Sequence, residues 1–171
     1  MKKKVSSESE FDPSLITVLN VIIPHDSITT DDNLYGKTAA EKTNVTVAAN
    51  FGFNAVVKQS RVIVNVTFEA LDSQLAPAGI KGFCVLHVFL GLSNMEKFII
   101  KNADGSESFA REVANIMVGL AYSTCRGIVF ARTQGTIIGP IMLPVVDPST
   151  LFGDFVTQSK ASEASEQSTL E

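Results

Sequence analysis

Alternating hydrophobic and polar positions predict four β-strands in the first half of the chain. The alternation is clearest at residues 61–70, where every second side chain is Val, Phe or Ala, the period of a strand with one buried face. Residues 44–51 alternate in the same way. Residues 14–23 and 82–92 are β-branched or apolar on both faces, as expected for strands that are covered on two sides. Together the four strands predict an antiparallel sheet.

A helical pattern follows the strands at residues 109–131, where apolar side chains recur at spacings of three and four. One row of these side chains is expected to face the sheet. It consists of Phe109, Val113, Ile116, Met117, Leu120, Ile128 and Ala131. A second apolar row, on another side of the helix, consists of Val118, Tyr122, Cys125 and Val129. A helix that is apolar on more than one side needs a cover besides its own sheet.

Small residues spaced four apart form a third row on this helix and indicate what the second cover is. The row consists of Asn115, Gly119, Ser123, Gly127 and Ala131. Such a ridge allows another helix to approach closely, so we expect the helix to form a subunit interface. The expected contacts come from Val118, Gly119, Tyr122, Ser123, Cys125 and Gly127. A single buried helix in a monomeric core is the alternative.

Both ends of the chain are polar, and they bound a single domain. Residues 1–13 form a charged arm, and residues 158–171 are rich in Ser, Glu and Gln, so neither segment has the apolar surface to order itself. We expect both to be disordered, the second as an acidic tail. One α+β domain lies between them at residues 14–157. A chain of 171 residues is long enough to bury a core of its own.

Two short segments after the long helix carry a more specific signal. The helix is followed by the turn Gln-Gly-Thr at residues 134–136, then by an apolar segment with prolines, and then by the step Ser-Thr-Leu-Phe at residues 149–152. Before this step, Asp147 is suited to cap a short second helix that has Pro148 at its first position. This order resembles the SecB family of export chaperones, over about residues 45–155. In that family a long oligomerising helix ends at an Arg-Gly-Thr-like turn, and a last helix begins at an Asp-Ala-Leu-Phe-like step. The present chain lacks the Arg of the turn and has one extra residue between the turn and the step.

The doubly apolar helix with its ridge of small residues predicts a homotetramer, arranged as a dimer of dimers, and the alternative is an assembly that stops at two chains. The resemblance implies that the protein binds unfolded polypeptide in apolar grooves without ATP. The crossover loop that walls such a groove in the family corresponds to the segment around Phe51 and Phe53. Together with these rings, we expect Leu151, Phe152 and Phe155, on one face of the last helix, to bind the client. The alternative for Phe51 and Phe53 is that they plug the edge of the core.

Three functions remain open on the sequence alone. The first is a holdase for preproteins on their way to export, and the second is a SecB-like chaperone that protects the antitoxin of a toxin–antitoxin pair. A toxin gene beside this one would favour the second over the first. The third, of another class, is a small-ligand carrier or an enzyme with a pocket between helix and sheet. A saturable thermal shift with a small molecule would indicate it. We favour the first.

The export motor SecA is expected to bind weakly or not at all. The resemblance implies docking through acidic residues on the outer face of the sheet, one of them on the strand that leads toward the long helix. Here that strand, residues 83–90, has no carboxylate. Its Val85 and His87 cannot supply the complementary charge that such docking uses. Asp26, after the first strand, is the one candidate left for motor docking.

The remaining chemistry of the sequence is sparse. Lys and Arg total 14 against 18 Asp and Glu, without the clustered cations that bind nucleic acid. His25 and His87 do not stand at metal-ligand spacing from Cys84 or Cys125. No Gly-rich loop is followed by the lysine of a nucleotide site. We therefore expect no metal, no cofactor, no nucleic acid and no enzymatic activity.

The compartment is expected to be the cytoplasm. Cys84 and Cys125 have the character of small buried hydrophobes rather than of a disulfide, which favours a reducing environment. No small-residue cleavage site follows the N-terminal lysines. The apolar runs are short for a membrane span, and Arg126 interrupts the long helix, so we expect no membrane insertion.

Overall fold

The computed structural model describes residues 11–33, 36 and 40–152 of the chain. Its strands are β1 (Ile16–Thr30), β2 (Lys42–Asn54), β3 (Gln59–Leu71), β4 (Pro77–Leu92), β5 (Ile99–Lys101) and β6 (Glu107–Phe109). The long helix is α1 (Arg111–Thr133), and short 3-10 turns span Pro13–Leu15, Met95–Phe98 and Pro148–Thr150. The predictions for residues 1–10, for residues 153–171 and for Phe155 lie outside the described residues.

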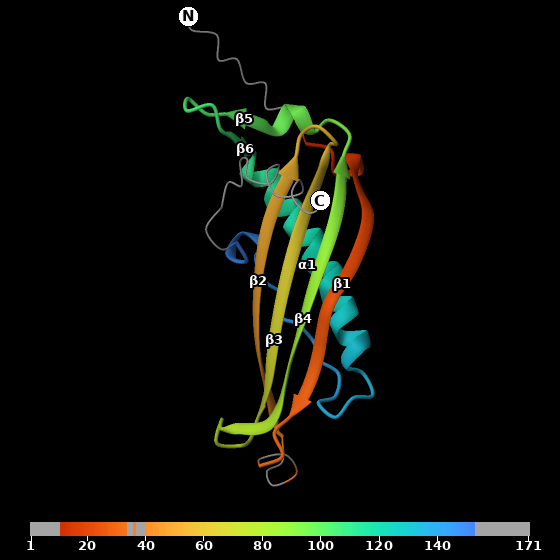
Figure 1. Ribbon diagram of the computed structural model, residues 1–171, viewed down its shortest axis with the longest axis vertical. Coiled ribbons are helices and arrows are strands. Elements are labelled where there is room, and N and C mark those ends of the chain that lie inside the picture. Colours follow the sequence, from red (N-terminus) through yellow and green to blue (C-terminus); the bar gives the residue numbers. More distant parts are fainter. Residues whose placement is uncertain (1–10, 34–35, 37–39, 153–171) are drawn as a thin grey trace, which may run out of the picture.

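The large sheet has four antiparallel strands in the order β1-β4-β3-β2, and α1 lies across one of its faces (Figure 1). The helix starts beside the small β5–β6 hairpin and runs diagonally to the β1 edge (Figure 1). The predicted α+β fold with one antiparallel sheet and one long helix is confirmed. The strands are longer than the sequence pattern indicated, because pairing continues beyond the purely apolar stretches.

β1 shows the largest difference in length. The sequence predicted an end at Pro24, but the strand continues to Thr30. The pairing with β4 is irregular between Ile22 and His25, and β1 is an edge strand. A proline is tolerated at an edge or at a bulge because its missing N–H leaves no ladder bond unmade there.

The core lies between the sheet and α1. On β3 the residues expected to face inward are each at most 5% exposed: Val62, Val64, Val66, Phe68 and Ala70. β4, whose two apolar faces suggested a central or interface position, is central, and it buries Cys84, Leu86, Val88 and Leu90 on the helix side. β4 thus lies between two strands, and its buried row of side chains provides the surface on which α1 packs.

The faces of α1 are assigned differently from the prediction. The helix buries Val113, Ala114, Met117, Val118, Ala121, Tyr122, Cys125, Val129 and Thr133. Ile116 and Leu120, expected to face the sheet, are exposed. The sheet-facing stripe includes Ala114 and Ala121, whose small side chains let the helix lie close to the strands. Val118, Tyr122 and Cys125 therefore belong to the core of the protomer rather than to an exposed interface.

The return segment, residues 134–147, runs back along α1. It buries Ile141 and Leu143, and Tyr122 donates a hydrogen bond from its hydroxyl to the carbonyl of Pro144, at 2.7 Å. The segment ends at the 3-10 turn Pro148–Thr150, where the side chain of Asp147 accepts a hydrogen bond from the backbone N–H of Ser149 at 2.9 Å. The second helix was predicted to begin here, and the structure describes it only as far as this turn and the two residues after it.

The expectation that no apolar run is long enough for a membrane span needs correction, whereas the absence of membrane insertion stays a prediction. By length and apolar composition alone, the 23 residues of α1 are sufficient to cross a membrane, despite Arg126. In this structure the helix packs one side against the sheet, as the core helix of a water-exposed domain also does.

Candidate functional site

Three aromatic rings gather where β2 approaches the start of α1. The ring centroid of Phe109 lies 5.4 Å from that of Phe51 and 5.2 Å from that of Phe53, with tilted planes. These separations are within the range in which aromatic pairs attract one another. Phe109 is buried, whereas Phe51 and Phe53 are only half-buried. The two rings predicted to bind a client therefore lie together, rest on the core and keep part of their surface exposed.

The outer edge of β2 runs beside these rings, and the chain's own Leu151 and Phe152 occupy it at Ala49. The backbone N–H of Ala49 donates outward to the carbonyl of Leu151, at 2.8 Å, and Ala49 and Phe152 form a parallel bridge. Because strand residues alternate in direction and β2 pairs with β3 without a break, the backbone groups of Val47 and Phe51 point to the same edge as those of Ala49. In the described part of the chain no further strand is paired there.

Leu151 and Phe152 were predicted to line the client site with Phe51 and Phe53. The structure brings both residues to β2, where Leu151 is buried and Phe152 is half-buried. Leu151 is thus buried against β2 and does not offer an exposed surface to a client. Sequence reasoning missed Phe109, whose position at the start of a helical stripe gave no sign that it would meet the two rings of β2.

The outward side of α1 carries what remains of the predicted interface row. Ser123 and Gly127 are exposed, and a side chain added at Gly127 would meet nothing within 4 Å. At Gly119 an added Cβ would lie 3.0 Å from Cγ of Pro148, so this glycine makes room for the chain's own return segment. The exposed Ile116 and Leu120 lie on this side as well.

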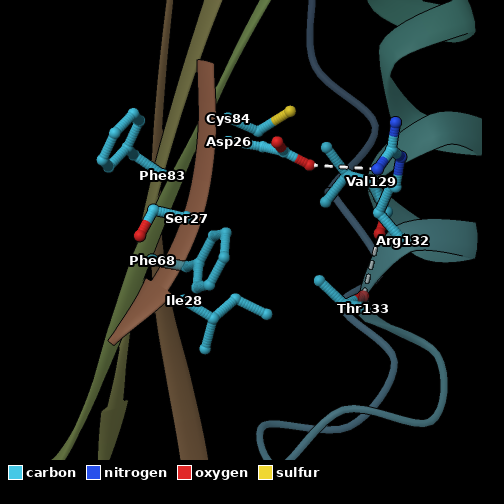
Figure 2. Close-up of a pocket in the computed structure, with 9 residues that line it drawn as sticks. All are labelled: Asp26, Ser27, Ile28, Phe68, Phe83, Cys84, Val129, Arg132 and Thr133. Atoms are coloured by element: carbon cyan, nitrogen blue, oxygen red, sulfur yellow. Dashed lines mark hydrogen bonds and ion pairs between the residues drawn. The ribbon is translucent and has the colours of Figure 1, made fainter. Parts of the chain in front are cut away.

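A pocket of about 260 Å³ lies between the C-terminal end of α1 and the sheet (Figure 2). Ile28 and Phe68 line it from the sheet side and Val129 from the helix, so the floor is apolar. At its rim, Arg132 of α1 and Asp26 of β1 form an ion pair at 3.3 Å (Figure 2). The possible motor-docking residue Asp26 is therefore paired within its own chain and points to the helix side of the sheet.

Buried thiols lie at and near this pocket. Burial raises the pKa of the Cys84 thiol, and the nearby Asp26 carboxylate raises it further. Burial also raises the pKa of Cys125 to about 12. Both thiols stay protonated at neutral pH and are poor nucleophiles, because the thiolate is the reactive form.

The opposite face of the sheet carries a mixture of uncharged polar, apolar and basic side chains. β4 presents Phe83, Val85, His87 and Phe89 there. Burial lowers the pKa of His87, and the positive charges of Arg61 and His25 lower it further. Among the described strands, Glu69 supplies the one carboxylate of this face, opposite Lys81.

Metal chemistry finds no support in the described part of the chain. Within residues 11–33, 36 and 40–152, no three or more His, Cys, Asp or Glu side chains come together in a group that could hold a metal ion. His25 and His87 instead lie on the outer face of the sheet, at positions paired with Val85 and Ile22.

Comparison with known proteins gives a fold but no sequence family. No protein-family model matches the sequence, and no curated protein matches it. The structure is similar to a SecB-like chaperone of Mycobacterium tuberculosis, solved in complex with a ChAD peptide from the HigA1 antitoxin, with a TM-score of 0.55 and 7% sequence identity. The match covers 78% of this chain and 91% of that chain. A protein of unknown function from Streptococcus agalactiae aligns with a TM-score of 0.40 and 8% identity, over 76% of this chain and 97% of that one.

At this level of identity the similarity concerns the fold. The chain has a SecB-like fold, in which one long helix lies across a four-stranded antiparallel sheet, and the expected resemblance to that family is confirmed at this level.

Proposed function

We propose that the protein is a SecB-like holdase that binds extended segments of unfolded polypeptide without ATP. The observation that carries the proposal is the outer edge of β2, which the described part of the chain covers only at Ala49, beside the half-buried rings of Phe51 and Phe53. A client segment can add to this edge through main-chain hydrogen bonds, which are independent of its sequence. Its apolar side chains then cover the exposed parts of the rings.

The energy for holding a client comes from apolar burial. Covering roughly 100 Å² of apolar surface contributes about 2.5 kcal/mol at about 25 cal/mol per Å². This is on the order of a seventyfold gain in affinity for one aromatic contact. Several such contacts, repeated around an oligomer, give useful affinity without nucleotide. Phe155 completes the set of proposed client contacts.

The proposed assembly is a homotetramer, a dimer of dimers, that uses the outward side of α1. Ser123 and Gly127 keep their proposed interface role because they are exposed and small. Ile116 and Leu120 extend this surface with apolar side chains that are 40% and 37% exposed. Covering them with a second helix would remove apolar area that a lone protomer leaves in water.

The proposed clients are preproteins in the cytoplasm. A second candidate is an antitoxin, and the similar chaperone bound to an antitoxin peptide favours it. A toxin gene next to this one, together with loss of the antitoxin when the chaperone is absent, would favour this second client.

SecA is proposed to bind weakly or not at all. The ion pair of Asp26 with Arg132 and the absence of carboxylates on β4 leave little negative charge for electrostatic docking. Tight binding to SecA at low salt that weakens at physiological salt would contradict this proposal.

The test of the holdase function measures the light scattered by an unfolded, aggregating client as the protein is added without ATP. Wild-type protein is expected to suppress aggregation, and Phe51→Ala to suppress it less. Phe89→Ala is the matched control, because it removes a half-buried ring from the opposite face of the sheet. Far-UV circular dichroism and mass in solution verify that each variant is folded. No suppression by wild type, or equal suppression by folded Phe51→Ala and Phe89→Ala, would refute the proposal.

A further inference from the structure

The pocket at the end of α1 combines an apolar floor with a hydrogen-bond acceptor and a hydrogen-bond donor at its rim. Ile28 lines it from the sheet and Val129 from the helix (Figure 2). Asp26 and Arg132 form the rim. The carboxylate accepts hydrogen bonds and the guanidinium donates them. Their side chains keep 43% and 58% of their surface exposed, so both are within reach of a ligand from solvent.

The edge of β1 at this pocket also offers backbone groups. β1 is the outer strand on this side of the sheet. The N–H of Asp31 donates to the carbonyl of Gly79 at 2.8 Å, one step beyond the paired residues Thr30 and Ile80. Since antiparallel pairs alternate between bonded and non-bonded positions, the backbone groups of Ile28 point to the open edge. A strand added there would pair beside Ile28, which lines the pocket.

We propose that this pocket is a second contact point for polypeptide, and that it accepts one branched aliphatic or aromatic side chain of an extended segment. The N–H and C=O groups of that segment meet the carboxylate of Asp26 and the guanidinium of Arg132. The inference rests on the proposed function, because it names a subsite for the same class of ligand. It assigns Asp26 and Arg132 to client recognition instead of motor docking.

The volume and the charges both favour such an occupant. An apolar cavity of about 150 Å³ holds benzene, so a pocket of about 260 Å³ has room for one phenyl or isobutyl group. The rim carries one negative and one positive group, and a peptide unit likewise offers one donor and one acceptor. A free anion would meet repulsion from Asp26 and a free cation repulsion from Arg132. An exposed ion pair contributes little to stability, so opening it to contact a backbone costs little.

The test uses capped peptides of the sequence Ser-Thr-Xaa-Thr-Ser, in which Xaa is Leu or Gly. Binding is followed by methyl NMR of Ile28 and Val129 in the full chain. The Leu peptide is expected to shift both signals and to bind about tenfold more tightly than the Gly peptide, as burial of an isobutyl group requires. Equal binding of the two peptides, or shifts elsewhere with none at Ile28 and Val129, would overturn the inference.

Variants separate the pocket from its surroundings. Ile28→Trp, which fills the pocket, is expected to abolish the peptide-induced shift at Val129, and Arg132→Gln to weaken binding at least threefold. Lys58→Gln is the matched control for Arg132→Gln, because it breaks the pair of Lys58 with Glu96, which is also 3.3 Å long and also exposed. If folded Arg132→Gln and Lys58→Gln bind the Leu peptide equally, the rim does not contact the peptide and the proposal is overturned.

Three further outcomes separate this inference from the holdase function and from self-association. If wild type suppresses client aggregation and Phe51→Ala does not, while the Leu peptide leaves Ile28 unshifted, the holdase stands and the subsite is refuted. If the Ile28 signal depends on protein concentration without peptide, a second copy of the chain occupies the pocket, and the subsite is refuted as well. If the Leu peptide binds at the pocket but no client is held, the subsite stands as a peptide site and the holdase is refuted.

Discussion

The buried hydroxyl of Thr133 holds the return segment to the end of α1. Its Oγ1 donates to the carbonyl of Val129 at 2.9 Å and approaches that of Phe130 at 3.3 Å, while it accepts the backbone N–H of Ile141 at 2.8 Å. Thr133→Val keeps the shape of the side chain but removes the acceptor, which leaves the N–H of Ile141 buried without a partner. Such a group costs about 1–3 kcal/mol. For a domain of this size the melting temperature should fall by roughly 2–12 °C.

The matched control for this variant is Thr124→Val on the same helix. The hydroxyl of Thr124 also donates one turn back, to the carbonyl of Leu120 at 3.0 Å, but this bond is exposed and the residue is half-buried. No buried backbone N–H of the described residues donates to it. Urea unfolding should therefore show a loss several times larger for Thr133→Val than for Thr124→Val, and Thr133→Ser, which keeps the oxygen, should recover most of it. Amide exchange at Ile141 should speed up only in Thr133→Val. Equal losses for the two valine variants would refute the reasoning.

Two further predictions concern assembly and pH. Gly127→Leu should leave the protomer folded but reduce the mass measured by light scattering, because the site is open in the protomer; Gly119→Leu should instead destabilise the protomer, because its side chain would meet Pro148. A wild-type monomer at micromolar concentration would contradict the interface. Hydrogen bonds from the backbone N–H and the side chain of Ser149 hold the pKa of Asp147 below 3.8. A lowered folded-state pKa stabilises the protein above pH 3.8 and loses that effect as the pH falls through the folded-state value. The urea midpoint should therefore fall more steeply with acid in wild type than in Asp147→Asn, and identical pH profiles would contradict this cap.

The strands could be predicted because their pattern is local. In β3, alternation along the sequence directly reports which side chains face the helix, and Val62 to Ala70 are buried as expected. The full length of β1 could not be predicted in this way. Its second half has polar residues such as His25 and Asp26, and what keeps it extended is the pairing with β4, a partner distant in sequence.

The orientation of α1 could be predicted only in part. Apolar residues cover more than half of its circumference, so their spacing permits several rotations about the helix axis. The rotation is decided by how closely the helix approaches the sheet, and Ala114 and Ala121 make that approach possible. The prediction placed the large residues Ile116 and Leu120 against the sheet, although small residues form the centre of the contact.

The candidate sites depend on contacts between segments that lie far apart in sequence. Phe51 and Phe53 were found from the sequence, but Phe109 joins them only because α1 begins beneath β2. The ion pair of Asp26 with Arg132 depends equally on the diagonal course of the helix. No local sequence pattern predicts either contact, because the two partners belong to different elements, each with its own periodicity.

The proposed binding of polypeptide at the outer edge of β2 places few demands on the amino-acid sequence. The main chain of β2 offers the same hydrogen-bonding groups whichever side chains it carries, and the aromatic contacts require exposed ring area rather than particular partners. A strand with alternating apolar residues meets both requirements, whatever the identity of the individual side chains. A strand edge with adjacent apolar rings therefore tolerates extensive replacement of its side chains, and the proposed function depends on the pattern of the strand more than on individual residues.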